Sequence, residues 1–369
     1  MIGRSVPFID LHPAEDAPAV HEAIQRVLTR GWFILGPEVD AFEEEFADAC
    51  GALHAVAVGN GTDAIALMLR ALGIGAGDEV IVPAITAGYT ALAVTSTGAV
   101  PVVADVDDDT LTLDPAACAA AITSRTKAIV PVHLYGQAAP LPALTTLAGR
   151  HGLAIVEDCC QAHLATCDGT PVGTTTTGGA FSFYPTKNLG AIGDGGAIIT
   201  GDAQLASRIR LLRNGGQSDR YHHQIAGFNS RLDELQAAVL RARLPLLSGW
   251  TARRRELAAH YRRQLTARVR PLIERDPGHV YHLFPVRVRD EDGRGSNRNA
   301  LQQHLLTHGI ETLIHYPVPL NRQPAFAASG RSENPVAEVA ARELLSLPLH
   351  PRMPGTQVDQ VAAGIESWR

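Results

Sequence analysis

The sequence alternates between short β-branched runs and longer segments of helical periodicity, and this alternation limits the fold more than any other feature. Strands are predicted at 55–58, 79–83, 100–106, 127–134 and 153–158, with helices between them at 63–73, 89–98, 114–122 and 140–152. Such alternation is typical of an α/β fold with a largely parallel sheet covered by helices. Two further strands, at 180–185 and 195–201, follow without an intervening helix, so the sheet is predicted to be mixed.

The flanking segments are mostly helical. Two helices are predicted before the sheet, at 19–29 and 38–49, and the chain turns helical again from about residue 202. The helical segment that starts at Arg231 is too long for one typical helix, so Pro245 is expected to break or kink it.

The last hundred-odd residues start again with a strand at 281–290 and a helix at 299–309. They are interpreted as a smaller α+β domain. A length of 369 residues suggests two domains. The predicted division is a large domain at 1–250, which includes an N-terminal leader segment, and a small domain at 251–369.

Charge and cysteine usage exclude several classes of protein. The net charge is −6, so the chain has no basic field for nucleic acid or an anionic membrane. No window is apolar enough for a signal peptide or a transmembrane helix. The odd count of five cysteines indicates reduced thiols. A cytoplasmic protein that binds neither nucleic acid nor membrane is therefore expected.

Lysine is almost absent from this chain, which makes its two lysines informative. Of 32 positively charged residues only Lys127 and Lys187 are lysine. A lysine amine can lose its proton and attack a carbonyl group, whereas a guanidinium cannot. Lys187 lies in the constrained segment FSFYPTKNLGAIGDGG, where apolar surroundings favour a lowered pKa. Lys127 is expected to be an ordinary surface residue.

Two further motifs lie at predicted strand ends. Gly59–Asp63 joins a strand to a helix, and its glycines and free N–H groups suit a phosphate, although for this motif alone a tight turn with a capping side chain is the favoured interpretation. Asp158 ends a parallel strand, where it can hold a protonated ring nitrogen or simply cap the next helix. Gln161 follows closely. No metal is predicted, because the spacing of Cys159, Cys160, His163 and Cys167 fits no standard zinc pattern.

Taken together, these motifs supply a phosphate cradle, a carboxylate for a ring nitrogen and a lysine that can form a Schiff base. A pyridoxal phosphate enzyme needs this set of groups. The combination is far more specific than any one of its parts.

Longer motifs along nearly the whole chain resemble the DegT family of nucleotide-sugar aminotransferases, which are fold-type I pyridoxal phosphate enzymes. The segments that carry the resemblance are VPFIDL, GNGTDAI, GDEVIVP, VHLYGQ, IVEDCCQAH, AFSFYPTKNLGAIGDGGAI, LRNGG, YHHQIAGFNSRLDELQAA and HYPVPL. The lysine motif and NSRLDE are the most specific of these.

The resemblance implies a role for each matching residue. Lys187 would carry the cofactor as a Schiff base, Asp158 would pair with the pyridine nitrogen, and Gln161 would lie against the ring or its hydroxyl. The phosphate would be held by one group of residues, namely Gly61, Thr62, Asp63 and Ser182, with Asn229 from a partner subunit. The sugar nucleotide would be approached by another, namely Tyr184, Tyr221, His222, His315 and Tyr316.

Two positions depart from the family pattern. Many relatives carry an aromatic residue that stacks on the cofactor where this chain has Ala87, so a small residue is expected over the cofactor face. Tyr89, two residues later, is expected to pack within its helix. The usual AHG sequence reads Ala162-His163-Leu164 here, which is expected to reshape the wall beyond Gln161.

The expected protein is a cytoplasmic homodimer with shared active sites, in which an amino acid donor, by resemblance L-glutamate, aminates a ketone on a nucleotide-linked deoxysugar. The motifs most resemble relatives that act on dTDP-linked 3-keto-6-deoxyhexoses. The alternatives are a 4-keto sugar nucleotide or a cyclitol ketone. A dehydratase of the same fold would replace the lysine, and a non-catalytic regulator would not need Lys187, Asp158 and Ser182.

Overall fold

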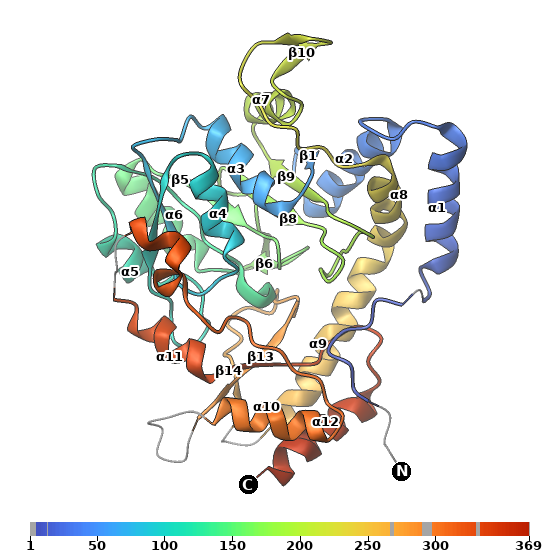
Figure 1. Cartoon of the computed structure of the whole chain (residues 1–369), viewed down its shortest axis with the longest axis vertical. Helices are drawn as coiled ribbons and strands as arrows, with labels where there is room; N and C mark the ends of the chain where they lie inside the picture. Colours follow the sequence, from blue (N-terminus) through green and yellow to red (C-terminus); the bar gives the residue numbers. More distant parts are fainter. Residues whose placement is uncertain (1–4, 13, 266–268, 290–296, 330–332, 369) are drawn as a thin grey trace.

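The computed structural model describes residues 5–12, 14–265, 269–289, 297–329 and 333–368. Its main feature is a seven-stranded sheet in the order β1-β9-β8-β5-β4-β2-β3 (Figure 1). The strands are β1 (His54–Val58), β2 (Glu79–Pro83), β3 (Val100–Ala104), β4 (Thr126–Ile129), β5 (Ala154–Asp158), β8 (Gly178–Ser182) and β9 (Gly196–Thr200). Only β9 runs antiparallel to its neighbours, β1 and β8, which confirms the predicted mixed sheet.

Helices cover both faces of this sheet, because successive strand residues point to opposite faces. In β1, Val56 and Val58 pack into one apolar cluster with α3, α4 and α7, whereas Ala55 and Ala57 pack into another with α2 and α8. The helices are α1 (Ala17–Arg30), α2 (Pro37–Cys50), α3 (Gly61–Ala71), α4 (Tyr89–Ser96), α5 (Pro115–Ala120), α6 (Leu141–His151), α7 (Ala203–Arg213), α8 (Glu234–Arg243) and α9 (Leu247–Gln264). The expected α/β fold is confirmed.

The predicted break at Pro245 is also confirmed. The long helical segment divides into α8 and α9, and the three-residue 3₁₀ turn Leu244–Leu246 between them contains the proline. Proline has no N–H to donate and its ring crowds the preceding turn, so the α-helical hydrogen-bond pattern cannot continue through it.

A smaller antiparallel sheet lies below the large one in Figure 1, in the order β12-β13-β14. Its strands are β12 (Val269–Pro271), β13 (Phe284–Val288) and β14 (Leu344–Leu347), and the helices of this region are α10 (Arg298–Thr307), α11 (Pro335–Glu343) and α12 (Gly355–Ser367). β13 is shorter than the strand predicted at 281–290, whose last residue lies outside the described residues.

A separate apolar cluster joins this smaller sheet to the C-terminal half of α9 and to Val6 of the leader, which bridges to Ile310. The predicted boundary at residue 250 falls within α9. The division into two domains remains a prediction.

The remaining short elements are 3₁₀ turns and small ribbons. The turns are η1 (Leu134–Gly136), η3 (Leu320–Arg322) and η4 (Pro324–Ser329), and the ribbons pair β6 (Thr166–Cys167) with β7 (Thr170–Pro171) and β10 (Gln217–Asp219) with β11 (His222–His223). All five cysteines are free thiols, as predicted. Among the described residues, no helix combines the length and the apolarity that crossing a bilayer requires.

Candidate active site

The predicted site residues gather where strands of the large sheet end. Asp158 is the last residue of β5 and Ser182 the last of β8, and Lys187 follows five residues after Ser182. Gly61 is the first residue of α3, which two residues separate from the end of β1. In an open α/β sheet, the carboxyl ends of parallel strands form the edge where ligands bind.

The N-terminus of α3 lies close against Ser182. The Asn60 side chain accepts from the N–H of Asp63 at 2.9 Å, and the Asn60 carbonyl accepts the first intrahelical bond, from Ala64. The N–H groups of Gly61 and Thr62 therefore have no acceptor within the helix. A Cβ atom added at Gly61 would lie 2.6 Å from Cys160 Sγ and 2.8 Å from Ser182 Cβ, so only glycine fits this approach. A helix N-terminus brought this close to a serine suits a phosphate group.

The side chain of Asp63 is already engaged within the protein. Its Oδ2 accepts from Ser230 Oγ at 2.6 Å and from Asn60 Nδ2 at 3.1 Å. Ser230 Oγ in turn accepts from the N–H of Gly59 at 3.0 Å. The carboxylate therefore ties the segment around Ser230 to the cradle, and a direct contact of Asp63 with phosphate remains a prediction.

Asp158 is buried and held by two donors. Its Oδ2 accepts from Thr90 Oγ1 at 2.8 Å and its Oδ1 from the N–H of Cys160 at 3.1 Å. Thr90 Oγ1 lies 3.1 Å from Thr86 Oγ1, which extends the chain of hydroxyls. These bonds hold the carboxylate at the edge of the sheet, where it can pair with a protonated ring nitrogen.

The adjacent Glu157 points to the opposite face of the sheet. It is fully buried and its Oε2 lies 2.7 Å from His133 Nε2 and accepts from the N–H of Gly173 at 2.7 Å. His133 Nδ1 accepts from the N–H of Ala139 at 3.0 Å. His133, Glu157 and Cys159 are close enough to hold a metal ion, but both histidine nitrogens are already hydrogen-bonded within the protein.

Lys187 is half-buried, and desolvation lowers the pKa of its amine, although its electrostatic interactions with Cys160 and Asp158 partly oppose this shift. Its backbone N–H donates to the carbonyl of Tyr184 at 2.8 Å, which closes the tight turn expected from Pro185. A lowered pKa favours the uncharged amine that Schiff-base formation requires. Lys127, by contrast, is an exposed residue of β4.

Gln161, His315 and Tyr316 form a wall beside this lysine. Gln161 Nε2 donates to Tyr316 Oη at 3.0 Å. Burial and the charge on Lys187 lower the pKa of His315 to about 4, and burial raises the pKa of Tyr316 to about 12. Both side chains are therefore neutral near pH 7, and the structure brings these three predicted residues together with Lys187.

The other predicted residues lie apart from this group. Tyr221 and His222 belong to the β10–β11 ribbon, which projects at the top of Figure 1, and Tyr221 is 75% exposed. Asn229 is also exposed, and Tyr184 is 52% exposed. In a single chain these four side chains face solvent.

The two departures from the family pattern have different outcomes. Tyr89 is 66% exposed at the start of α4, so the expectation that it packs within its helix is wrong. Leu164 has a φ of 60°, in the left-handed region that favours glycine, so it adopts a backbone conformation that suits the family's usual glycine. That a small residue, Ala87, lies over the cofactor face remains a prediction.

Two residues of the site were not singled out from the sequence, and a third, His163, was considered only as a metal ligand and as part of the altered AHG sequence. Thr90 binds Asp158, and Tyr135 binds Gln161 through its N–H at 2.7 Å. His163 is fully buried, with its Nε2 2.9 Å from the carbonyl of Ser182, and burial lowers its pKa to about 3. Tyr135 stands in the quoted motif VHLYGQ, but nothing local marks Thr90.

Comparison with known proteins agrees with this geometry. The model of the DegT/DnrJ/EryC1/StrS aminotransferase family matches residues 15–366. A dTDP-3-amino-3,4,6-trideoxy-alpha-D-glucose transaminase from Streptomyces venezuelae is 48% identical over 98% of this chain and 96% of the relative. The erythromycin biosynthesis sensory transduction protein EryC1 of Saccharopolyspora erythraea is 49% identical over 98% of this chain and 99% of its own.

Among solved structures, DesV of S. venezuelae in complex with a ketimine intermediate superposes with a TM-score of 0.94. It is 48% identical, and the match covers 99% of this chain and 98% of DesV. The cradle at Gly61 fits the phosphate of pyridoxal phosphate. Asp158, which accepts from Thr90, fits the ring nitrogen, and the half-buried Lys187 fits the aldehyde. The chain belongs to the DegT/DnrJ/EryC1/StrS family and is a pyridoxal phosphate-dependent aminotransferase.

Proposed function

We propose that this enzyme transfers an amino group from L-glutamate to the 3-keto group of a dTDP-linked 6-deoxyhexose. The observation that carries the proposal is the likeness to the S. venezuelae transaminase, whose name specifies a dTDP-linked 3-amino sugar and whose identity of 48% extends over nearly the whole of both chains. His315 and Tyr316, which form the wall beside Lys187, lie within the part of the chain that this relative matches.

The chain's own residues have distinct tasks in this reaction. Pyridoxal phosphate supplies an aldehyde that carries the amino group between substrates and a ring that accepts electrons. Gly61, Thr62 and Ser182 would hold its phosphate, and Asp158 would keep its ring nitrogen protonated. The amine of Lys187 accepts and returns the proton at the reacting carbon, which requires a group that is not permanently charged.

A second copy of the chain would complete the site. The proposal is supported by the exposure of Asn229 and of Tyr221 and His222, for which the family resemblance implies roles in cofactor or substrate binding. It is also supported by three consecutive exposed apolar residues before α2, namely Trp32, Phe33 and Ile34, which a partner would cover. Such a homodimer would work in the cytoplasm.

The test is a panel of ketones with glutamate as donor. Purified enzyme loaded with pyridoxal phosphate is given a dTDP-3-keto-6-deoxyhexose, its 4-keto isomer and a cyclitol ketone, and kcat/KM is measured for each. The proposal predicts clear preference for the 3-keto sugar. Preference for the 4-keto sugar or the cyclitol would replace the proposed substrate while leaving the aminotransferase chemistry intact.

The same panel addresses a regulatory role, which the name of EryC1 includes for that protein. The Lys187→Ala variant serves as the matched control, because it removes the amine and leaves the rest of the site unchanged. Turnover by the wild type and none by the variant would support an enzyme. Absence of turnover on every ketone, from a wild type loaded with cofactor, would contradict the proposed function.

A further inference from the structure

Tyr135 closes a ring of contacts that joins the edge of the large sheet to the wall formed by His315 and Tyr316. Its backbone N–H donates to Gln161 Oε1 at 2.7 Å, and Gln161 Nε2 donates to Tyr316 Oη at 3.0 Å. The ring is completed by the Tyr135 hydroxyl, which donates to the carbonyl of His315. Two of these contacts link residues more than 150 positions apart in the sequence.

The direction of these hydrogen bonds is fixed by chemistry. A backbone N–H can only donate, so the oxygen of the Gln161 amide must face Tyr135 and its NH₂ group must face Tyr316. A hydroxyl that accepts from an NH₂ group keeps its own proton for another acceptor. The ring therefore leaves the Tyr316 hydroxyl as a donor to whatever occupies the site.

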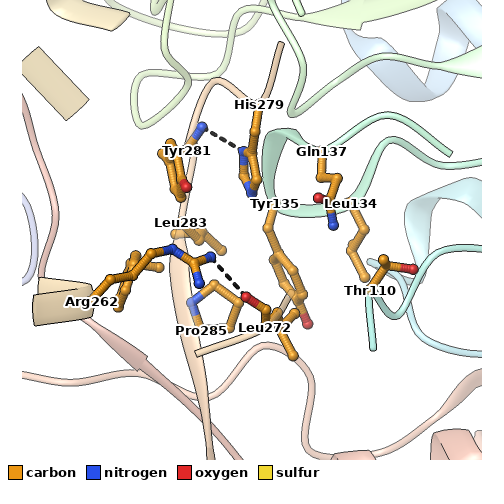
Figure 2. A pocket seen from close by; sticks show the side chains of 11 residues that line it. Thr110, Leu134, Tyr135, Gln137, Arg262, Leu272, His279, Tyr281, Leu283 and Pro285 are labelled. Atoms are coloured by element: carbon orange, nitrogen blue, oxygen red, sulfur yellow. Dashed lines mark hydrogen bonds between the residues drawn. The ribbon is translucent and has the colours of Figure 1, made fainter. Parts of the chain in front are cut away.

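The turn that carries Tyr135 is well suited to hold this arrangement. Tyr135 has a φ of 60°, a conformation uncommon for a non-glycine residue, and the turn is tied to the next segment by Val280 N–H to Gly136 O at 2.9 Å. The Tyr135 side chain is only 1% exposed and lines a small pocket with Leu134 and Leu272 (Figure 2). Burial also raises its pKa well above 10, so the hydroxyl keeps its proton.

We propose that Tyr135 is a positioning residue. Its N–H sets the orientation of the Gln161 amide, and its hydroxyl anchors His315 so that Tyr316 donates a hydrogen bond to the sugar substrate. The hydrogen bond from Tyr316 to the sugar rests on the proposed function. The anchoring of the 315–320 segment by the Tyr135 hydroxyl holds whatever the substrate is, and can be measured without it.

Tyr135→Phe tests the anchor, because it removes only the hydroxyl and keeps the ring and the N–H. Tyr261→Phe is the matched control, since Tyr261 is fully buried and its hydroxyl also donates to a backbone carbonyl, that of Pro348 at 2.9 Å. Hydrogen exchange followed by mass spectrometry on the cofactor-loaded enzyme is expected to quicken about fivefold in the 315–320 segment of Tyr135→Phe, the effect of one lost hydrogen bond. Tyr261→Phe is expected to leave this segment unchanged.

Kinetics then test the donor role of Tyr316. Tyr135→Phe is expected to raise KM for the keto sugar about five- to tenfold with kcat within about twofold, since it loosens the positioning of one hydrogen bond. In a Tyr316→Phe background the same change is expected to have no further effect, because the donor that it positions is gone. Tyr261→Phe changes neither constant.

Each result bears on a separate part of the proposal. Equal exchange at 315–320 in Tyr135→Phe and the wild type would overturn the anchor. Faster exchange with additive effects of Tyr135→Phe and Tyr316→Phe on KM would overturn the donor role alone. If the wild type aminates none of the ketones, the proposed function fails, and the exchange experiment still decides the anchor.

Discussion

Replacing Thr90 by valine tests how the structure holds the Asp158 carboxylate in place in the active site. Thr90 Oγ1 donates to Asp158 Oδ2 at 2.8 Å, and both side chains are at least nine-tenths buried. Valine has the same shape but no donor, so the N–H of Cys160 at 3.1 Å would remain as the backbone donor to Asp158 among the described residues. A hydrogen bond to a charged group contributes about 1.5–3 kcal/mol, so the cofactor-free protein should lose about that much free energy of unfolding.

The size of the thermal shift follows from the length of the chain. An unfolding entropy of about 2.1 cal/mol/K per residue, applied to 369 residues, converts this loss into a Tm lower by about 2–4 °C. The assay is differential scanning calorimetry of the cofactor-free protein. With pyridoxal phosphate bound the shift should be smaller, because the ring nitrogen would supply a second donor to Asp158.

Thr251→Val is the matched control for this experiment. Within the described residues, Thr251 is buried and its Oγ1 has no hydrogen-bond partner, so its replacement should leave Tm unchanged or raise it slightly. A fall in Tm of the same size in both variants would mean that the loss reflects buried threonine in general. An unchanged Tm in Thr90→Val would refute the view that the Thr90 hydroxyl stabilises the Asp158 carboxylate.

Other predictions concern the lysine, a buried glutamate and the second subunit. Lys187→Arg should bind pyridoxal phosphate but show no turnover and no fixation of cofactor by borohydride; turnover would refute the assignment. Glu234→Gln should destabilise the protein by about 2–3 kcal/mol in calorimetry, because its fully buried carboxylate accepts three N–H groups at the start of α2, each at 2.9 Å. Asn229→Asp and Lys187→Ala should each be nearly inactive as homodimers, whereas their heterodimer should recover about half of wild-type activity, one intact site of two; a well-folded but inactive heterodimer would argue against a shared site.

The sequence was sufficient to predict the elements that depend on local pattern. β-branched runs indicated the strands, and Pro245 indicated the division between α8 and α9. Lys187 could be identified because this chain otherwise uses arginine for positive charge. These signals are visible because each follows from the chemistry of one residue or from a short period in the sequence.

Contacts between distant segments could not be predicted in the same way. Thr90 lies 68 residues from Asp158, and Glu234 lies almost 200 residues from the helix start that it caps. A threonine in a helix or a glutamate after an aspartate carries no local mark of its partner, because the sheet order that brings the partners together is itself non-local. Glu234 belongs to the NSRLDE motif. The structure shows that this residue of the motif caps α2, in addition to any role of the motif in binding.

The direction of the Asn229 side chain bears on whether the active site is shared between two chains. Its neighbour Ser230 is buried and bonds Asp63 and Gly59 of the chain's own phosphate cradle, so proximity alone would allow Asn229 to serve that cradle. Asn229, however, forms an antiparallel bridge with Asn214, and successive residues of an extended segment point to opposite sides. With Ser230 directed inward, Asn229 is directed outward, where it is exposed. Phe228 N–H to Leu212 O at 2.7 Å and Ser230 N–H to Arg213 O at 2.9 Å hold this direction from both sides. This direction supports the proposal that the phosphate contacted by Asn229 belongs to another chain.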